Sequence, residues 1–84
     1  MTDDELRQAI EAVVMVAIEP VSPGLMAELF EEPAERVEAA ARRIAEAYEA
    51  DRRGFVLAKI AGGYRFQTHP DQAIYVEQIG RAHV

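Results

Sequence analysis

The fold is decided by residues 54–68, GFVLAKIAGGYRFQT, in which two apolar-rich runs flank Gly62 and Gly63. β-Branched and aromatic side chains, which suit a pleated and half-buried surface, are frequent in both runs. A glycine pair between two such runs predicts a tight hairpin turn, because glycine adopts positive φ angles without steric cost. A lone two-stranded hairpin is only marginally stable in water, so we expect this one to pack on the helices predicted before it.

The first predicted helix is capped by Thr2 or Asp3 and carries an apolar stripe at helical spacing. The stripe consists of Leu6, Ile10, Val13, Val14 and Ala17. Residues 12–18 are all apolar, so the second half of this helix needs cover on every side. Either the third helix and the hairpin supply that cover, or one face belongs to another chain.

Two further helices are predicted before the hairpin. Ser22 followed by Pro23 is typical of a helix cap and a first-turn proline, and predicts a short second helix at residues 23–30. An apolar face at helical spacing predicts the longest helix at residues 33–50, and Gly54 is expected in the left-handed conformation past its end. The apolar side of the short helix is expected to consist of Leu25, Met26, Leu29 and Phe30.

A closing helical segment is predicted after the hairpin, beginning at residues 69–71. The residues expected to pack back on the core from this segment are Ile74, Tyr75 and Ile79. Residues 80–84 show neither helical periodicity nor a cap, and we interpret them as a truncated or non-native tail after a single domain at residues 1–79.

The order of the predicted elements is helix, short helix, longer helix and β-hairpin, which is the order of a winged helix-turn-helix. The predicted fold class is therefore mainly α with a small antiparallel β-hairpin. It comprises three helices, a two-stranded wing and a C-terminal helical segment. In DNA-binding domains of this type, the second helix of the helix-turn-helix enters the major groove.

Charge argues against that use of the fold. The chain of 84 residues has a net charge of −6, and the predicted third helix carries Glu35, Glu38, Glu46 and Glu49 around its three arginines. Phosphate would repel such a helix, so direct nucleic-acid binding is not expected. The only basic stretch is residues 52–69, which have four cations and no acid. Its cations are Arg52, Arg53, Lys59 and Arg65.

No catalytic or metal site is predicted. The two histidines, His69 and His83, are isolated, and adjacent acids such as Glu31 and Glu32 do not face each other on a helix. We therefore expect no enzyme activity and no cofactor. The absence of cysteine, of a signal sequence and of a long apolar run predicts a cytoplasmic protein without a membrane span.

Two stretches resemble the first domain of bacterial segregation and condensation protein B. They are IEAVVMVAIEPVSPGLMAELF at residues 10–30 and YEADRRGFVLAKIAGGYRFQTHPDQAIYVEQI at residues 48–79. The residues that match the family pattern are Glu19, Pro20, Val21, Gly54, Ala61, Gly62, Gly63, Tyr64, Thr68, Pro70, Asp71, Tyr75 and Val76. Family members normally continue into a second winged-helix domain, which is absent from these 84 residues.

The resemblance implies a non-enzymatic accessory subunit of the bacterial condensin. Such subunits form homodimers and bind the kleisin subunit, segregation and condensation protein A (ScpA), which bridges the ATPase heads of the structural maintenance of chromosomes (SMC) protein. The implied role is in chromosome condensation and partition during the cell cycle, in the cytoplasm and at the nucleoid through the complex.

Two apolar groups are candidates for the surface that contacts a second copy or another partner. One is Val14, Met15 and Ile18, and the other is Phe55, Tyr64 and Phe66 in the wing. The residues alone do not favour either group. The alternative function is a winged-helix transcriptional regulator that docks on DNA through its basic wing. Lys59 and Arg65 are the candidate contacts for that function.

Overall fold

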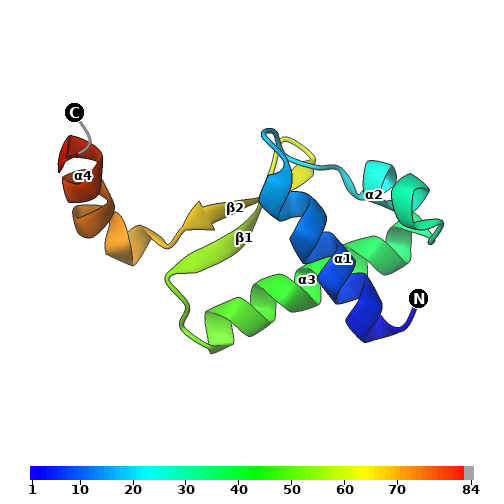
Figure 1. Ribbon diagram of the computed structural model, residues 1–84. Helices are drawn as coiled ribbons and strands as arrows, with labels where there is room; N and C mark the ends of the chain where they lie inside the picture. Colours follow the sequence, from blue (N-terminus) through cyan, green and yellow to red (C-terminus); the bar gives the residue numbers. More distant parts are fainter. Residues whose placement is uncertain (83–84) are drawn as a thin grey trace.

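Four helices and one hairpin follow one another in the predicted order. A computed structural model of the protein describes residues 1–82 (Figure 1). Its elements are α1 Asp3–Val16, α2 Pro23–Phe30, α3 Ala34–Ala50, β1 Phe55–Ile60, β2 Gly63–Thr68, the 3₁₀ turn η1 Pro70–Gln72 and α4 Ala73–Ala82. The predicted fold class, a winged helix-turn-helix with a two-stranded antiparallel wing, is confirmed.

Helix α1 begins with a capping box and ends earlier than predicted. The Thr2 hydroxyl accepts a hydrogen bond from the Glu5 backbone N–H at 3.1 Å, and the Glu5 carboxylate accepts one from the Thr2 N–H at 2.7 Å. At the other end Ala17 is already extended, with φ −72° and ψ 140°. Ala17 is therefore exposed rather than part of the buried stripe, because the chain leaves the helix before Pro20.

Helix α2 covers the predicted residues but buries less of its apolar side than expected. The Ser22 hydroxyl accepts a hydrogen bond from the Leu25 N–H at 3.1 Å and so caps the helix. Met26 is fully buried, whereas Leu25 and Leu29 are half-exposed or more. Ala27 and Phe30 are partly buried against the core, so Leu25 and Leu29 are the two expected residues of this short helix that face outward.

The turn of the wing is shifted by one residue from the prediction. Ala61 and Gly62 form the two-residue loop and both have positive φ, 52° and 80° respectively, as in a type I′ hairpin turn. Gly63 is instead the first residue of β2, paired with Ile60. It is required for another reason, because a Cβ at this position would lie 2.8 Å from the carbonyl carbon of Pro20.

The end of α3 also differs from the prediction. Arg52, not Gly54, has the left-handed conformation, with φ 56°. The backbone N–H groups of Arg52 and Arg53 donate to the carbonyls of Glu49 and Tyr48 at 3.0 and 3.2 Å, so the chain reverses two residues earlier than the glycine suggested.

The core lies between α1 and α3, and it is completed by α2 and by the inner face of the wing. Its buried members are Leu6, Ile10, Val14, Val21, Met26, Val37, Ala40, Ala41, Ile44, Leu57 and Tyr64. Val21 extends the sheet, since its backbone exchanges two hydrogen bonds with Tyr64, at 2.9 and 2.8 Å. This bridge holds the loop between α1 and α2 against the wing.

Helix α4 does not pack back on the core, and that prediction is wrong. It leaves the open end of the hairpin and extends away from the three helices, as Figure 1 shows. Ile74, Tyr75 and Ile79 are 59–67% exposed. The helix continues through Gly80 to Ala82, so part of the predicted tail is helical, while His83 and Val84 lie outside the described residues.

Candidate protein-interaction surfaces

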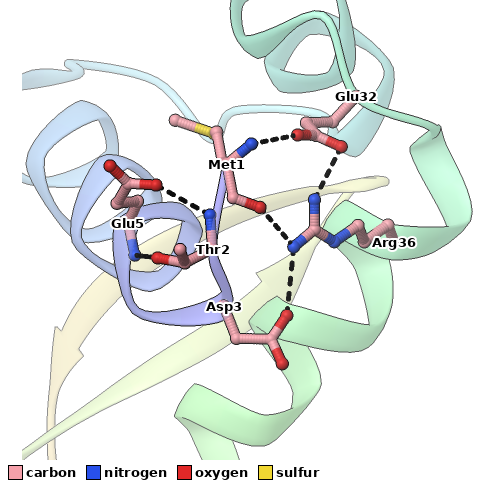
Figure 2. Close-up of polar contacts among 6 residues, drawn as sticks. All are labelled: Met1, Thr2, Asp3, Glu5, Glu32 and Arg36. Atoms are coloured by element: carbon pink, nitrogen blue, oxygen red, sulfur yellow. Dashed lines mark hydrogen bonds and ion pairs between the residues drawn. The ribbon is translucent and has the colours of Figure 1, made fainter.

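The helix that would read DNA has its first arginine engaged in a polar network at the protein surface. Arg36 donates hydrogen bonds to Glu32 at 2.8 Å, to Asp3 at 3.1 Å and to the Met1 carbonyl at 2.7 Å (Figure 2). The Met1 ammonium group lies 3.2 Å from the other oxygen of Glu32. The hydrogen bond from Arg36 lowers the pKa of Glu32, and the bonds to Glu32 and Asp3 raise the pKa of Arg36. This network fastens the start of α1 to the turn before α3.

One of the two candidate DNA contacts in the wing is also engaged. The Lys59 ammonium lies 2.5 Å from a carboxylate oxygen of Glu38 on α3, and the Tyr64 hydroxyl donates to the same oxygen at 3.0 Å. The hydrogen bond from Lys59 is the main reason that the pKa of Glu38 is lowered. Arg65, opposite Ala58 on the outer face of the hairpin, is exposed. The structure thus separates Lys59 from Arg65 instead of presenting them together.

The aromatic candidates of the wing pack against the body of the domain. The Phe55 ring lies 5.1 Å from the Tyr48 ring and 5.5 Å from the Phe66 ring, measured between centroids. The Tyr48 hydroxyl donates to Glu11 on α1. Tyr64 is only 3% exposed and is part of the core, so it cannot belong to a docking surface. The half-buried Phe55 and Phe66 join the wing to α3.

The other candidate group divides into one buried and two exposed residues. Val14 is buried in the core, which removes it from the candidate surface. Met15 is 69% exposed and Ile18 is 94% exposed. Ile18 lies in a groove of about 500 Å³ together with Val16 and Leu25. We call the exposed residues Met15, Val16, Ile18 and Leu25 the tip.

A second exposed apolar surface lies on α4. Its apolar side chains are Ile74, Tyr75, Val76 and Ile79, all exposed. At about 100° per residue, Tyr75, Ile79 and Val76 fall within an arc of about 100°, Ile74 lies about 100° to one side of it, and Glu77 lies nearly opposite Ile79. We call η1 and α4 together, residues 70–82, the arm.

Sequence reasoning missed three of these exposed residues, namely Val16, Leu25 and Val76. Val16 lies within the apolar run 12–18, and that run was the available signal. Leu25 belongs to a short helix with more apolar residues than one face can bury. Val76 matches the family pattern, but it was not expected to be exposed because the closing helix was predicted to pack on the core.

The part of the chain described contains neither a metal-ligand cluster nor a helix that could span a membrane. Among residues 1–82, no three His, Asp or Glu side chains come together as metal ligands do. His69 serves as a cap, since its Nδ1 accepts a hydrogen bond from the Asp71 N–H at 3.1 Å. None of the helices in these residues combines the length and the apolar character of a membrane span.

Comparison with known sequences gives a consistent set of relatives. The sequence profile of the family described as "Segregation and condensation complex subunit ScpB" matches residues 8–83. Segregation and condensation protein B of Moorella thermoacetica is 35% identical over 78 residues, which are 93% of this chain and 40% of the relative. The chain thus spans well under half the length of this curated relative.

Solved structures of similar proteins share the fold. ScpB from Mycobacterium tuberculosis matches with a TM-score of 0.94 and 29% identity, over 99% of this chain and 52% of that one. A conserved hypothetical protein from Chlorobium tepidum matches with a TM-score of 0.80 and 30% identity, over 92% of this chain and 49% of that one. A dimer of an ScpB N-terminal domain complexed with ScpA peptide has a TM-score of 0.83 at 18% identity, over 90% of this chain and 95% of that one, and shows likeness of fold alone.

Proposed function

Because this chain belongs to the family of the segregation and condensation complex subunit ScpB, we propose that it is a non-enzymatic interaction module of a bacterial condensin. The observation that carries the proposal is the exposed apolar surface of a winged helix, at the tip and on the arm. Surface of this kind is typical of contacts with other polypeptides. The module acts in chromosome segregation and condensation, in the cytoplasm and at the nucleoid through its complex.

The proposed partners are a second copy of the chain and the kleisin ScpA. A solved N-terminal domain of ScpB with the same fold is a dimer in complex with ScpA peptide, which supports both partners. The ATP chemistry of the complex belongs to the SMC ATPase, which this subunit contacts only indirectly. Its own contribution is to set the geometry and stability of the kleisin bridge.

Two of the solved relatives are about twice as long as this chain, which suggests how the function is shared between two domains. The chain matches about half of the solved proteins from Mycobacterium tuberculosis and Chlorobium tepidum. We propose that residues 1–79 form the N-terminal winged-helix domain and that a second winged-helix domain shares the binding of ScpA. Self-association is the contribution of the domain described here.

The engagement of the basic residues supports a protein partner over DNA. Arg36 is held by Glu32 and Asp3, and Lys59 is held by Glu38. A DNA-binding domain would keep such cations available for phosphate and base edges.

The test is a pull-down with ScpA from the same genome. The chain is compared with and without a second winged-helix domain attached, and Gln8→Glu serves as a control with a new acid on an exposed part of α1. We expect ScpA to be recovered by the longer form and by its control variant. Failure of both forms to bind ScpA and to self-associate would contradict the proposal.

A titration with duplex DNA at two salt concentrations tests the alternative regulator function. Docking through the wing would give an affinity for DNA that falls as the salt concentration rises and that is lost in the double variant Lys59→Glu, Arg65→Glu. We expect the chain to show no such affinity. Tight binding with that behaviour would instead support docking through the wing.

A further inference from the structure

We infer that two copies of this chain associate by exchanging arms, so that the arm of each copy lies on the tip of the other. The inference rests on the self-association in the proposed function and names the surfaces that perform it. It follows from the isolation of the arm, from the distance between arm and tip within one chain, and from the area that each surface offers.

Within residues 1–82, the arm is a helix that the other three helices do not support. All residues from Asp71 to Gly80 are exposed, and Figure 1 shows α4 apart from the other helices. An isolated helix of about ten residues is only marginally stable in water, because nucleation is costly and few hydrogen bonds repay it. A helix of this length with one apolar side becomes stable when that side is packed. The arm therefore needs a surface outside its own domain.

The tip is the complementary surface, but one chain cannot join the two. The tip borders the turn end of the hairpin, where Pro20 meets Gly63. The arm leaves from the open end, where the His69 N–H donates to the Gly54 carbonyl at 2.7 Å. Six-residue strands hold these two ends about 20 Å apart, and Figure 1 shows the arm directed further away from the tip.

A dimer with a two-fold axis can cover the arm and the tip of both copies at the same time. With two hairpins placed side by side and antiparallel, the open end of each wing comes next to the turn end of the other. Each arm then reaches the tip of the other copy, and the two identical contacts close the assembly as a dimer. No further exposed arm or tip is left to extend it into a chain of subunits.

The available area favours exchange over the simpler pairings. From their exposed fractions, the apolar residues of the arm offer roughly 400 Å² and those of the tip roughly 500 Å², against the about 800 Å² per partner of a stable interface. Pairing arm with arm or tip with tip falls short of that area. Exchange uses both surfaces of both copies and reaches it.

The test compares three single variants by analytical ultracentrifugation. Ile18→Glu places a charge on the tip, Ile79→Glu places one on the arm, and Gln8→Glu is the control. Ile18 and Ile79 are both more than half exposed, so circular dichroism should show the α-helical domain intact in each variant. Arm exchange predicts that both isoleucine variants raise the dimer Kd at least about tenfold, while the control leaves it unchanged.

The pattern of effects separates the possible arrangements. A loss with Ile79→Glu alone would indicate arm-to-arm pairing, a loss with Ile18→Glu alone would indicate tip-to-tip pairing, and either result would overturn the inference. A chain that stays monomeric at every concentration would overturn it as well. If that monomer still bound ScpA, the proposed function would stand without arm exchange.

Cross-linking gives an independent measurement. The chain has no cysteine of its own, so Ile18→Cys and Ile79→Cys can be prepared as single-thiol proteins. We expect a short bismaleimide to join the two variants efficiently when they are mixed. The yield of cross-linked dimer should be lower when either variant is treated alone. Equal or greater yield for a variant with itself would overturn the exchange.

Discussion

Lys59 of the wing and Glu38 of α3 form an ion pair, with 2.5 Å between the ammonium nitrogen and a carboxylate oxygen. The same oxygen accepts the hydroxyl proton of Tyr64 at 3.0 Å. One acid on the helix that reads DNA in other winged helices is thus used to hold the wing in place. The ion pair is one place where a cation of the basic hairpin is neutralised by an acid of the helices.

Removing the charge of Glu38 should destabilise the domain slightly. Glu38→Gln keeps an oxygen for Tyr64 but loses the charge that faces Lys59, which is half-exposed, so we expect a loss of about 0.5 kcal/mol. Tyr64→Phe removes the buried hydroxyl and should cost about 1 kcal/mol. Urea unfolding measures both, with Glu46→Gln on the exposed side of α3 as control. Equal stability of Glu38→Gln and the control would show that the ion pair contributes nothing.

Stability should fall in acid. Hydrogen bonds lower the pKa of Glu38 and of Glu32 in the folded protein below the ordinary 4.5. A depressed folded pKa contributes stability above the unfolded pKa, and this contribution disappears as the pH falls through the folded value. The urea midpoint should therefore decrease below about pH 5, and less steeply in Glu38→Gln. An unchanged acid slope in that variant would contradict the assignment to Glu38.

Alkaline pH should destabilise the protein through two tyrosines. Burial, followed by hydrogen bonds to Glu11 and Glu38, raises the pKa of Tyr48 and of Tyr64 from 10.0 to about 12. A raised folded pKa means that the stability present below pH 10 is lost as the pH rises toward 12. Because the chain has three tyrosines and no tryptophan, phenolate absorbance in the Tyr75→Phe variant reports these two alone. Titration near pH 10 in the folded state would contradict the prediction.

Gly63→Ala should be the most damaging of the glycine substitutions in the wing. The added Cβ would lie 2.8 Å from the carbonyl carbon of Pro20 and 3.0 Å from the Val21 nitrogen, so the backbone must shift. We expect a loss of about 1–3 kcal/mol, as for overpacking in a core. Gly54→Ala is the matched control, because its Cβ would meet nothing within 4 Å and its φ is not positive. Thermal unfolding of both variants is the measurement, and equal melting temperatures would contradict this reading of the wing.

Two leucines with the same side chain should respond very differently to truncation. Leu6 is fully buried between the helices, so Leu6→Ala leaves a cavity and should cost about 2–5 kcal/mol. Leu29 is 58% exposed, and Leu29→Ala should change the stability by less than about 1 kcal/mol. Urea unfolding of the two variants gives the comparison. A similar loss for both would show that α2 is more deeply buried than the structure indicates.

Local chemistry made most of the domain predictable. Caps at Thr2 and Ser22, a proline at Pro23 and helical spacing of apolar residues specify α1 to α3 without reference to distant parts of the chain. The hairpin could likewise be predicted from its β-branched and aromatic side chains. The turn was misplaced by one residue, because Ala61 adopts a positive φ that alanine usually avoids. Gly63 is needed for a different reason, because a side chain there would collide with Pro20. Pro20 lies more than forty residues earlier in the chain, so the local sequence does not reveal this contact.

The candidate surfaces were only partly predictable. Met15 and Ile18 could be identified from a run of apolar residues too long for one face, but Val14 in the same run and Tyr64 in the wing are buried. Burial depends on which neighbour comes within a few ångströms, and periodicity does not give that distance. For the same reason the arm could not be recognised, since its apolar side chains resemble those of a helix that packs on its own core.

By itself, the sequence determined the order of the elements, the winged-helix fold and the acidic character of the helix after the turn, because caps, periodicity and charge act over a few residues. Tertiary structure alone decided that Glu38 holds Lys59 and Tyr64, that Arg36 is fastened to Glu32 and Asp3, and that α4 stands apart. Arg36 and Glu32 are one helical turn apart, but the other contacts join residues more than twenty positions apart. The position of α4 depends on the direction in which a turn releases the chain. No local pattern encodes that direction, because it depends on how the end of the hairpin and the turn η1 are placed in space.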